Sequence, residues 1–317
     1  MTSFRGTETR SPVPCPPASI VDVKPLRALL LYLAVVFVGA AMLAPWAHGA
    51  VQHLAPASAL ARQPFHRYVN RCLLGLALAG LWPLVRALGV RSWPDIGWRP
   101  RSGWSREAGA GLAVGFVSLA AAVAASVIFG GRDWRVDHPA PDWGRHLGNA
   151  TLAAIAVSIL EELLFRGAVF TALRRSGSFA STAIVTSGIY ALVHFFQKPP
   201  SPVVVGPLSG LVVLGQMLHG FTMLRDMVPG LITLALAGGL LAWARERTGA
   251  LWFPIGMHAG WIFWLKSFGF LTHASPDGPS RIWGTDKLYD GWAATVVLAA
   301  VALLLATRWP RPTATTG

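Results

Sequence analysis

Apolar runs of about 18 to 24 residues recur along the whole chain, and no other feature limits its possible folds as strongly. At a rise of 1.5 Å per helical residue, a run of this length covers the roughly 30 Å hydrocarbon core of a bilayer. The runs fall at about 26–46, 71–90, 107–129, 147–172, 178–197, 228–246, 249–271 and 291–308. We therefore expect an all-α fold, a polytopic transmembrane helical bundle of about eight spans.

A further semi-apolar stretch at 203–222 is harder to interpret. It is rich in glycine and contains Pro207 and His219. Irregular backbone at membrane depth is tolerated where protein or a water-filled cavity surrounds it. We expect a re-entrant or interfacial segment here, and the sequence leaves open whether this stretch spans the membrane.

Composition and charge agree with a lipid environment. Hydrophobic residues make up 53% of the chain and charged residues 13%, whereas soluble domains average about 25% charged residues. The formal net charge of +13 could indicate a nucleic-acid partner, but the basic residues are scattered through short loops, so we expect none. Cys15 and Cys72 form neither a disulfide framework nor a zinc knuckle.

The distribution of basic residues predicts the topology. With eight crossings, fifteen of the 27 Lys and Arg residues fall on the side that holds both termini, which should therefore be cytoplasmic. We expect an integral protein of the cytoplasmic membrane of a bacterium. Its expected parts are a tail at 1–25, N-terminal transmembrane helices and loops at 26–146, a core at 147–271, and a last helix with a short tail at 272–317.

Two adjacent carboxylates stand out within an apolar run. Twelve of the 14 acidic residues lie in tails, loops or at span edges, whereas Glu161 and Glu162 lie inside the fourth run. A charge near the middle of a span costs at least about 2.5 kcal/mol, so such residues need partners or a polar cavity. Residues of this kind are functional by default.

The two glutamates differ in their local partners. Glu162 and Arg166 are one helical turn apart, where a carboxylate and a guanidinium can pair. Glu161 points about 100° away and lacks that partner, and low dielectric makes an unpaired carboxylate a better general base. The plainer alternative is that both carboxylates only pack against Arg166 and other polar groups inside a bundle.

Two histidines lie in later apolar runs. Tyr190 and His194 are one turn apart on one face of the fifth run, and His258 lies in the seventh run among small residues that allow close helix approach. A lone intramembrane histidine is more often a helix-to-helix hydrogen bond than a catalyst. One glutamate and two histidines on three spans, however, match what hydrolysis requires.

These residues form three motifs with a familiar order and spacing. They are Glu161-Glu162-Leu-Leu-Phe-Arg166, Tyr190-Ala-Leu-Val-His194 and His258-Ala-Gly-Trp-Ile262. The set resembles the CAAX prenyl endopeptidase and bacteriocin-processing (CPBP, or Abi) family of intramembrane proteases, whose pattern is Glu-Glu-x-x-x-Arg, aromatic-x-x-x-His and His-x-x-x-Asn. The resemblance covers about residues 147–271.

The resemblance implies a set of roles. Glu161 would activate a water to attack a peptide carbonyl, and His194 and His258 would orient the water and stabilise the oxyanion. Supporting roles are implied for Glu162, Arg166 and Tyr190. The implied partner is a membrane-associated protein or peptide. The substrate and its dependence on prenylation stay open.

One position departs from the family pattern. Ile262 stands where the third motif usually has Asn or Asp, and an aliphatic side chain cannot donate to an oxyanion. Lys266 or a main-chain group would have to replace that donor, or catalysis is weaker. For Trp261 and Lys266 we favour an aromatic core residue and a snorkelling interfacial lysine.

Three alternatives follow from the same residues. Members of the family have also been described as metal-dependent, and Glu161, His194 and His258 would then be the ligands, with zinc possible. The helical motif His-Glu-x-x-His is missing, which favours a metal-free glutamate mechanism. A proton-coupled transporter would use the same residues as a relay, although the chain has no internal repeat. A scaffold or immunity protein of the same fold would suit the departure at Ile262.

Overall fold

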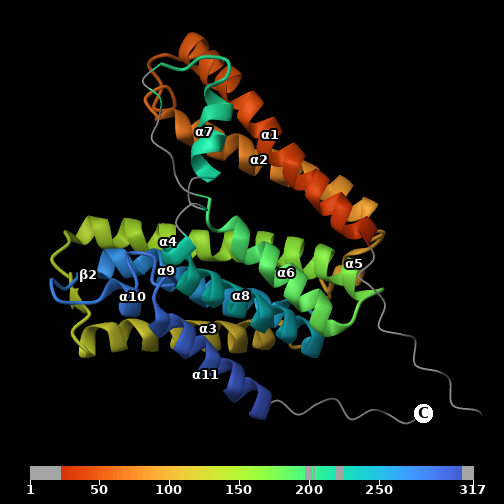
Figure 1. Ribbon diagram of the computed structural model, residues 1–317, viewed down its shortest axis with the longest axis vertical. Coiled ribbons are helices and arrows are strands. Elements are labelled where there is room, and N and C mark those ends of the chain that lie inside the picture. The colour runs from red at the N-terminus through yellow and green to blue at the C-terminus, as the bar shows by residue number, and fades with distance from the viewer. Residues whose placement is uncertain (1–22, 197–201, 203, 219–220, 222–223, 309–317) are drawn as a thin grey trace, which may run out of the picture.

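The structure is a computed structural model that describes residues 23–196, 202, 204–218, 221 and 224–308. Helices cover each of the eight predicted apolar runs (Figure 1). The main helices are α1 Val23–Leu54, α2 Phe65–Ala87, α3 Trp104–Ile128, α4 Ala140–Glu162, α6 Phe179–Val193, α8 Leu224–Thr248, α9 Trp252–Leu271 and α11 Trp292–Arg308. The shorter elements are η1 Trp93–Ile96, the π-helix η2 Leu163–Val169, α5 Phe170–Arg174, α7 Ser209–Met217, α10 Ser280–Trp283, and the strands β1 Arg132–Trp134 and β2 Thr272–Ala274.

Several helices have the length and composition of membrane spans. Within the described residues, four helical stretches are long and apolar enough to cross a bilayer, and α6 and α11 are shorter apolar helices. The four stretches are Leu26–Leu54, Phe65–Ala87, Trp104–Ile128 and Met227–Thr248. They indicate an integral membrane protein with a mostly helical fold. The number of eight crossings stays a prediction.

The described part of the stretch at 203–222 includes the short helix α7. Helix α7 has nine residues, so it is only about 14 Å long and cannot cross a bilayer. It lies against α1, where a Cβ on Gly210 would overlap the backbone of Ala41. This length agrees with a re-entrant or interfacial segment. His219 lies outside the described residues.

The helices form two groups that meet beside the π-helix. Helices α1, α2 and α7 lie together, apart from the bundle that contains α3, α4, α6, α8 and α9 (Figure 1). A cluster of buried side chains joins the two groups, with Leu29 on α1 and Leu84 on α2 packed against Ala168 and Leu173 on η2 and α5. The first two helices therefore brace the segment that follows Glu162.

Glycines set a very close approach between α3 and α9. Gly111 and Gly115 of α3 face Gly256 and Gly260 of α9, and a Cβ at any of these positions would overlap backbone atoms of the other helix. Small residues spaced four apart are the usual means of bringing membrane helices together. The predicted close approach around His258 is therefore present, and it fixes the height and rotation of α9.

Enlarging one of these glycines should destabilise the fold. We expect Gly115→Leu to lower the free energy of unfolding by about 3 kcal/mol, because the side chain would push α9 away from α3. Gly109→Leu on the same helix is the matched control, since a Cβ there meets nothing within 4 Å. Denaturant unfolding in detergent measures both, and equal stability of the two variants would contradict the contact.

A short two-stranded sheet was not predicted from the sequence. Strand β1 pairs antiparallel with β2, with Asp133 opposite His273. Arg132 is buried between them and donates to the Thr272 carbonyl at 3.1 Å and to Asp286 at 2.9 Å. These bonds tie the α3–α4 connection to the end of α9. The expectation of an all-α fold is therefore wrong for these six residues, because local patterns do not reveal such a distant strand partner.

Candidate active site

A π-helical segment follows the two glutamates directly. Helix α4 ends at Glu162, η2 continues as a π-helix from Leu163 to Val169, and α5 completes the same rod. The wider turn of a π-helix is rare and is found frequently at functional sites. Here it carries Arg166 into a fully buried position.

Glu162 and Arg166 form the ion pair that their spacing predicts. Arg166 Nη1 donates to Glu162 Oε1 at 2.9 Å, and both side chains are almost completely buried. Arg166 Nη2 also donates to the Gly238 carbonyl at 3.2 Å, and its Cζ lies 4.6 Å from the centroid of the Tyr190 ring. The guanidinium therefore links η2, α8 and α6 around one carboxylate.

The same carboxylate orients His258. His258 Nδ1 lies 2.9 Å from Glu162 Oε1, across 96 positions of sequence. A carboxylate paired with a guanidinium is an acceptor, so Nδ1 donates. The opposite nitrogen, Nε2, then faces the Tyr190 hydroxyl at 3.3 Å and Glu161 Oε2 at 3.8 Å.

His194 is fixed in the same manner by a different acceptor. It is the C-cap of α6, and its Nδ1 lies 2.7 Å from the Tyr190 carbonyl oxygen, to which it must donate. Its Nε2 therefore points toward Glu161 Oε2, at 3.9 Å. Each imidazole thus has one nitrogen held in place and the other directed at the same carboxylate.

Glu161 lies at the meeting point of these groups. Its side chain is 23% exposed, yet Oε2 is buried and has no hydrogen-bond partner among the described residues. Separations of 3.8 and 3.9 Å from the two imidazole nitrogens exceed direct hydrogen bonds and suit groups that a water molecule bridges. Glu161, His194 and His258 thus come together, and Glu162 with Arg166 lies directly behind them.

Residues 143–264 match a family model described as type II CAAX prenyl endopeptidase, Rce1-like. This segment is similar to that family. It extends from α4 into α9 and contains all three motifs, while α1, α2, α3 and α11 lie outside it. No curated protein and no solved structure matches the chain.

The structure shows what surrounds Ile262, the position at which the third motif departs from the family pattern. Ile262 is buried at 6% exposure, and Lys266 is exposed, which fits a snorkelling lysine rather than an oxyanion donor. Trp261 is a buried residue whose Nε1 donates to Ser118 Oγ at 2.9 Å. The donor that lies beside His258 instead is the hydroxyl of Tyr190.

A small cavity adjoins this hydroxyl. It has a volume of about 30 Å³ and is lined by Tyr190, His258, Trp261 and Tyr289 together with apolar side chains of α3, α8, α9 and α11. This space exceeds the 10 to 15 Å³ or so that one water needs. His258 and Tyr190 therefore both border this largely apolar cavity.

The metal-dependent alternative finds no preformed ligand group among the residues that the structure describes. Zinc sites hold nitrogen and oxygen ligands at about 2.0 to 2.2 Å from the ion. No group of three His, Cys, Asp or Glu side chains within the described residues is arranged to hold a metal ion. Metal-bound histidines usually donate a hydrogen bond from the nitrogen that does not bind the metal, and the two Nδ1 atoms donate in the same way here. The same hydrogen bonds also orient both rings toward the Glu161 carboxylate.

Two features of the Rce1-like site could not be found from the sequence. The hydrogen bond from His258 to Glu162 depends on how α9 is rotated against α4, which no local pattern shows. The contact between the Tyr190 hydroxyl and His258 likewise joins two distant helices. The only sequence feature that pointed to Tyr190 was its position one turn before His194, which predicts a shared helix face but not the hydrogen bond to His258.

Proposed function

We propose that the chain is an intramembrane endopeptidase that hydrolyses a peptide bond of a membrane-associated protein or peptide. The observation that carries this proposal is the buried Glu161 Oε2, which two oriented imidazole nitrogens face at 3.8 and 3.9 Å. The match of residues 143–264 to the Rce1-like family model supports the same reaction class and a protein or peptide substrate.

In the proposed reaction Glu161 is the general base. Its carboxylate takes a proton from a water that His194 orients, and the water oxygen attacks the carbonyl carbon of the scissile bond. The carbonyl electron pair moves onto oxygen and forms the oxyanion. Collapse of this intermediate breaks the carbon–nitrogen bond, while Glu161 returns its proton to the leaving amine. The products are a carboxylate and a free amino group.

The hydroxyl of Tyr190 is the donor placed to serve the oxyanion in this scheme. His258 Nδ1–H donates to Glu162, so Nε2 is the nitrogen that lies 3.3 Å from the Tyr190 hydroxyl and holds it beside the reacting groups. In the proposed reaction this hydroxyl donates to the oxyanion. Tyr190 would thus supply the donor that Ile262 cannot.

Removing this hydroxyl should slow turnover. We expect Tyr190→Phe to lower kcat about 10²-fold with little change in KM, because the donor acts mainly on the oxyanion. Tyr289→Phe is the matched control, since Tyr289 lines the same cavity. Adding Ile262→Asn to Tyr190→Phe should restore part of kcat. An effect on KM alone would assign Tyr190 to substrate binding rather than to the oxyanion.

The transporter and scaffold alternatives make different predictions for the same residues. A carrier would couple proton flux to Glu161 and the histidines, whereas a scaffold would bind peptide without cleaving it. The fixed Nδ1 atoms of both histidines favour hydrolysis, because each ring is locked by one hydrogen bond while relay groups must reorient between partners. The protease is therefore the better-supported function.

The proposal is tested by cleavage of a quenched membrane-peptide library by the detergent-purified protein. Glu161→Gln, His194→Ala and His258→Ala should each remove cleavage while the proteins stay folded. A parallel series with a zinc chelator measures any metal requirement. No cleavage by the folded wild type, with proton flux in vesicles that depends on Glu161, would replace the protease with the carrier.

A further inference from the structure

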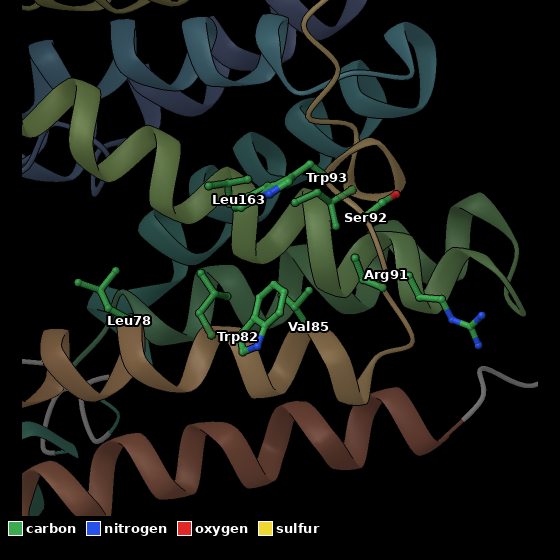
Figure 2. A pocket seen from close by; sticks show the side chains of 10 residues that line it. Leu78, Trp82, Val85, Arg91, Ser92, Trp93 and Leu163 are labelled. Atoms are coloured by element: carbon green, nitrogen blue, oxygen red, sulfur yellow. The ribbon is translucent and has the colours of Figure 1, made fainter.

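An apolar pocket lies beside the candidate active site but does not include its reactive groups. It has a volume of about 210 Å³ and lies between α2 and η2 (Figure 2). Leu78, Leu81, Trp82 and Val85 of α2 line one side, and Leu163 of η2 lines the other. Glu161, His194 and His258 are not among its lining residues. The pocket is therefore separate from the reactive groups.

The volume and lining of the pocket fit part of a hydrocarbon chain. Ligand pockets for compact small molecules usually measure about 300 to 1,000 Å³, and this one is smaller and almost entirely apolar. The candidate span on α2 is 17% buried, compared with 39 to 61% for the other three. Helix α2 is thus the candidate span most open to its surroundings, and in a membrane those surroundings are lipid.

One end of the pocket is polar and basic. Arg91 lies at the end opposite Leu78, with its guanidinium directed outward (Figure 2). Trp82 and Trp93 are 59% and 57% exposed at the rim, and Arg86 Cζ lies 5.1 Å from the Trp82 ring centroid. Exposed tryptophans with arginines mark the level of lipid headgroups. A chain in the pocket would place its headgroup beside Arg91.

The charge around this end favours an anion. Residues 86–107 contain five arginines and two acidic side chains, and one of the acids, Glu107, pairs with Arg101. The other, Asp95, accepts the backbone N–H groups of Arg91 and Ser92, which hold the pKa of this carboxyl below its usual range. Asp95 is thus a charged acceptor engaged within the η1 turn, and the surrounding field remains positive.

We propose that this pocket binds an anionic phospholipid, with one acyl chain between α2 and η2 and the phosphate at Arg91. Ile96 of η1 lines the pocket and also packs on the π-helix, where a Cβ at Gly167 would lie 3.3 Å from Ile96 Cβ. A bound lipid would therefore support the π-helix through η1. The proposal concerns lipid binding only, so it is tested by measuring lipid binding and does not depend on proteolytic activity.

The test is lipid retention by the full-length protein in detergent, measured by native mass spectrometry. Dioleoyl phosphatidylglycerol and dioleoyl phosphatidylcholine are titrated separately, since they share acyl chains and differ in charge. Wild type should retain phosphatidylglycerol about tenfold more tightly than phosphatidylcholine. Leu81→Trp should weaken both lipids by filling the pocket, and Arg91→Gln should abolish only the preference between them. The matched controls are Leu303→Trp, at an exposed position of α11, and Arg281→Gln, at an exposed position of α10 outside the pocket.

Three outcomes would overturn the proposal. Equal retention of the two lipids by wild type would remove the headgroup site at Arg91. Unchanged retention by Leu81→Trp would place the lipid elsewhere. Displacement of the lipid by a farnesylated peptide, with Arg91→Gln unaffected, would assign the pocket to the substrate's own lipid. Arg91→Gln alters an exposed side chain, so it remains informative even if Leu81→Trp fails to fold.

Discussion

Replacing Glu161 with glutamine is expected to lower peptide-bond cleavage by about 10⁴-fold while the protein stays folded and binds peptide. Glutamine keeps the size of the side chain but cannot accept the water proton or return it to the leaving amine. The carboxylate oxygen concerned has no hydrogen bond to lose among the described residues, so the substitution leaves the surrounding contacts in place. Single-turnover cleavage together with peptide binding measures the two effects separately.

A matched substitution separates chemistry from charge. Glu246 is another glutamate of the same chain, and it pairs with Arg174 at a partly exposed position. Glu246→Gln should leave turnover unchanged. If Glu161→Gln retained cleavage within about tenfold of wild type, Glu161 could not be the general base. If peptide binding and turnover fell together, the side chain would serve substrate binding instead.

The local part of this architecture was predictable from the sequence. Apolar runs predicted a helix at each of eight places, because a run's length and composition are local properties. The Glu162–Arg166 pair was predictable for the same reason, since one helical turn separates the two side chains. The glycines beside His258 indicated a close helix contact, and α3 provides it.

The remaining features depend on how distant helices are rotated against each other. Nothing near His258 in the sequence shows that Glu162 rather than Glu161 accepts from its Nδ1. The π-helix after Glu162 mixes strong helix formers with Gly167 and Val169, and helix propensity does not distinguish a π-helix from an α-helix. The pocket beside Leu163 forms because α2, about 80 residues earlier in the chain, packs near η2. Motif spacing thus predicted which residues belong to the candidate site, whereas the hydrogen bonds between them became visible only in the tertiary structure.

The second large effect is expected at Arg166. Arg166→Met should lower the free energy of unfolding by about 3 to 5 kcal/mol, because it leaves the Glu162 carboxylate buried without its cation. The Gly238 carbonyl also loses a donor. Unfolding by denaturant in detergent measures this change. Arg174→Met on the adjoining α5 is the control, since its pair with Glu246 is 39% and 33% exposed and should contribute at most about 1 kcal/mol.

A double substitution separates the cost of a stranded charge from the value of the pair. Glu162→Gln combined with Arg166→Met removes both charges, so most of the lost stability should return. Turnover should not return, because a neutral amide holds His258 Nδ1 more weakly than a carboxylate does. Recovery of stability and turnover together would mean that Glu162 and Arg166 only support each other. Recovery of stability alone would show that the Glu162 carboxylate is also needed to orient His258 for turnover.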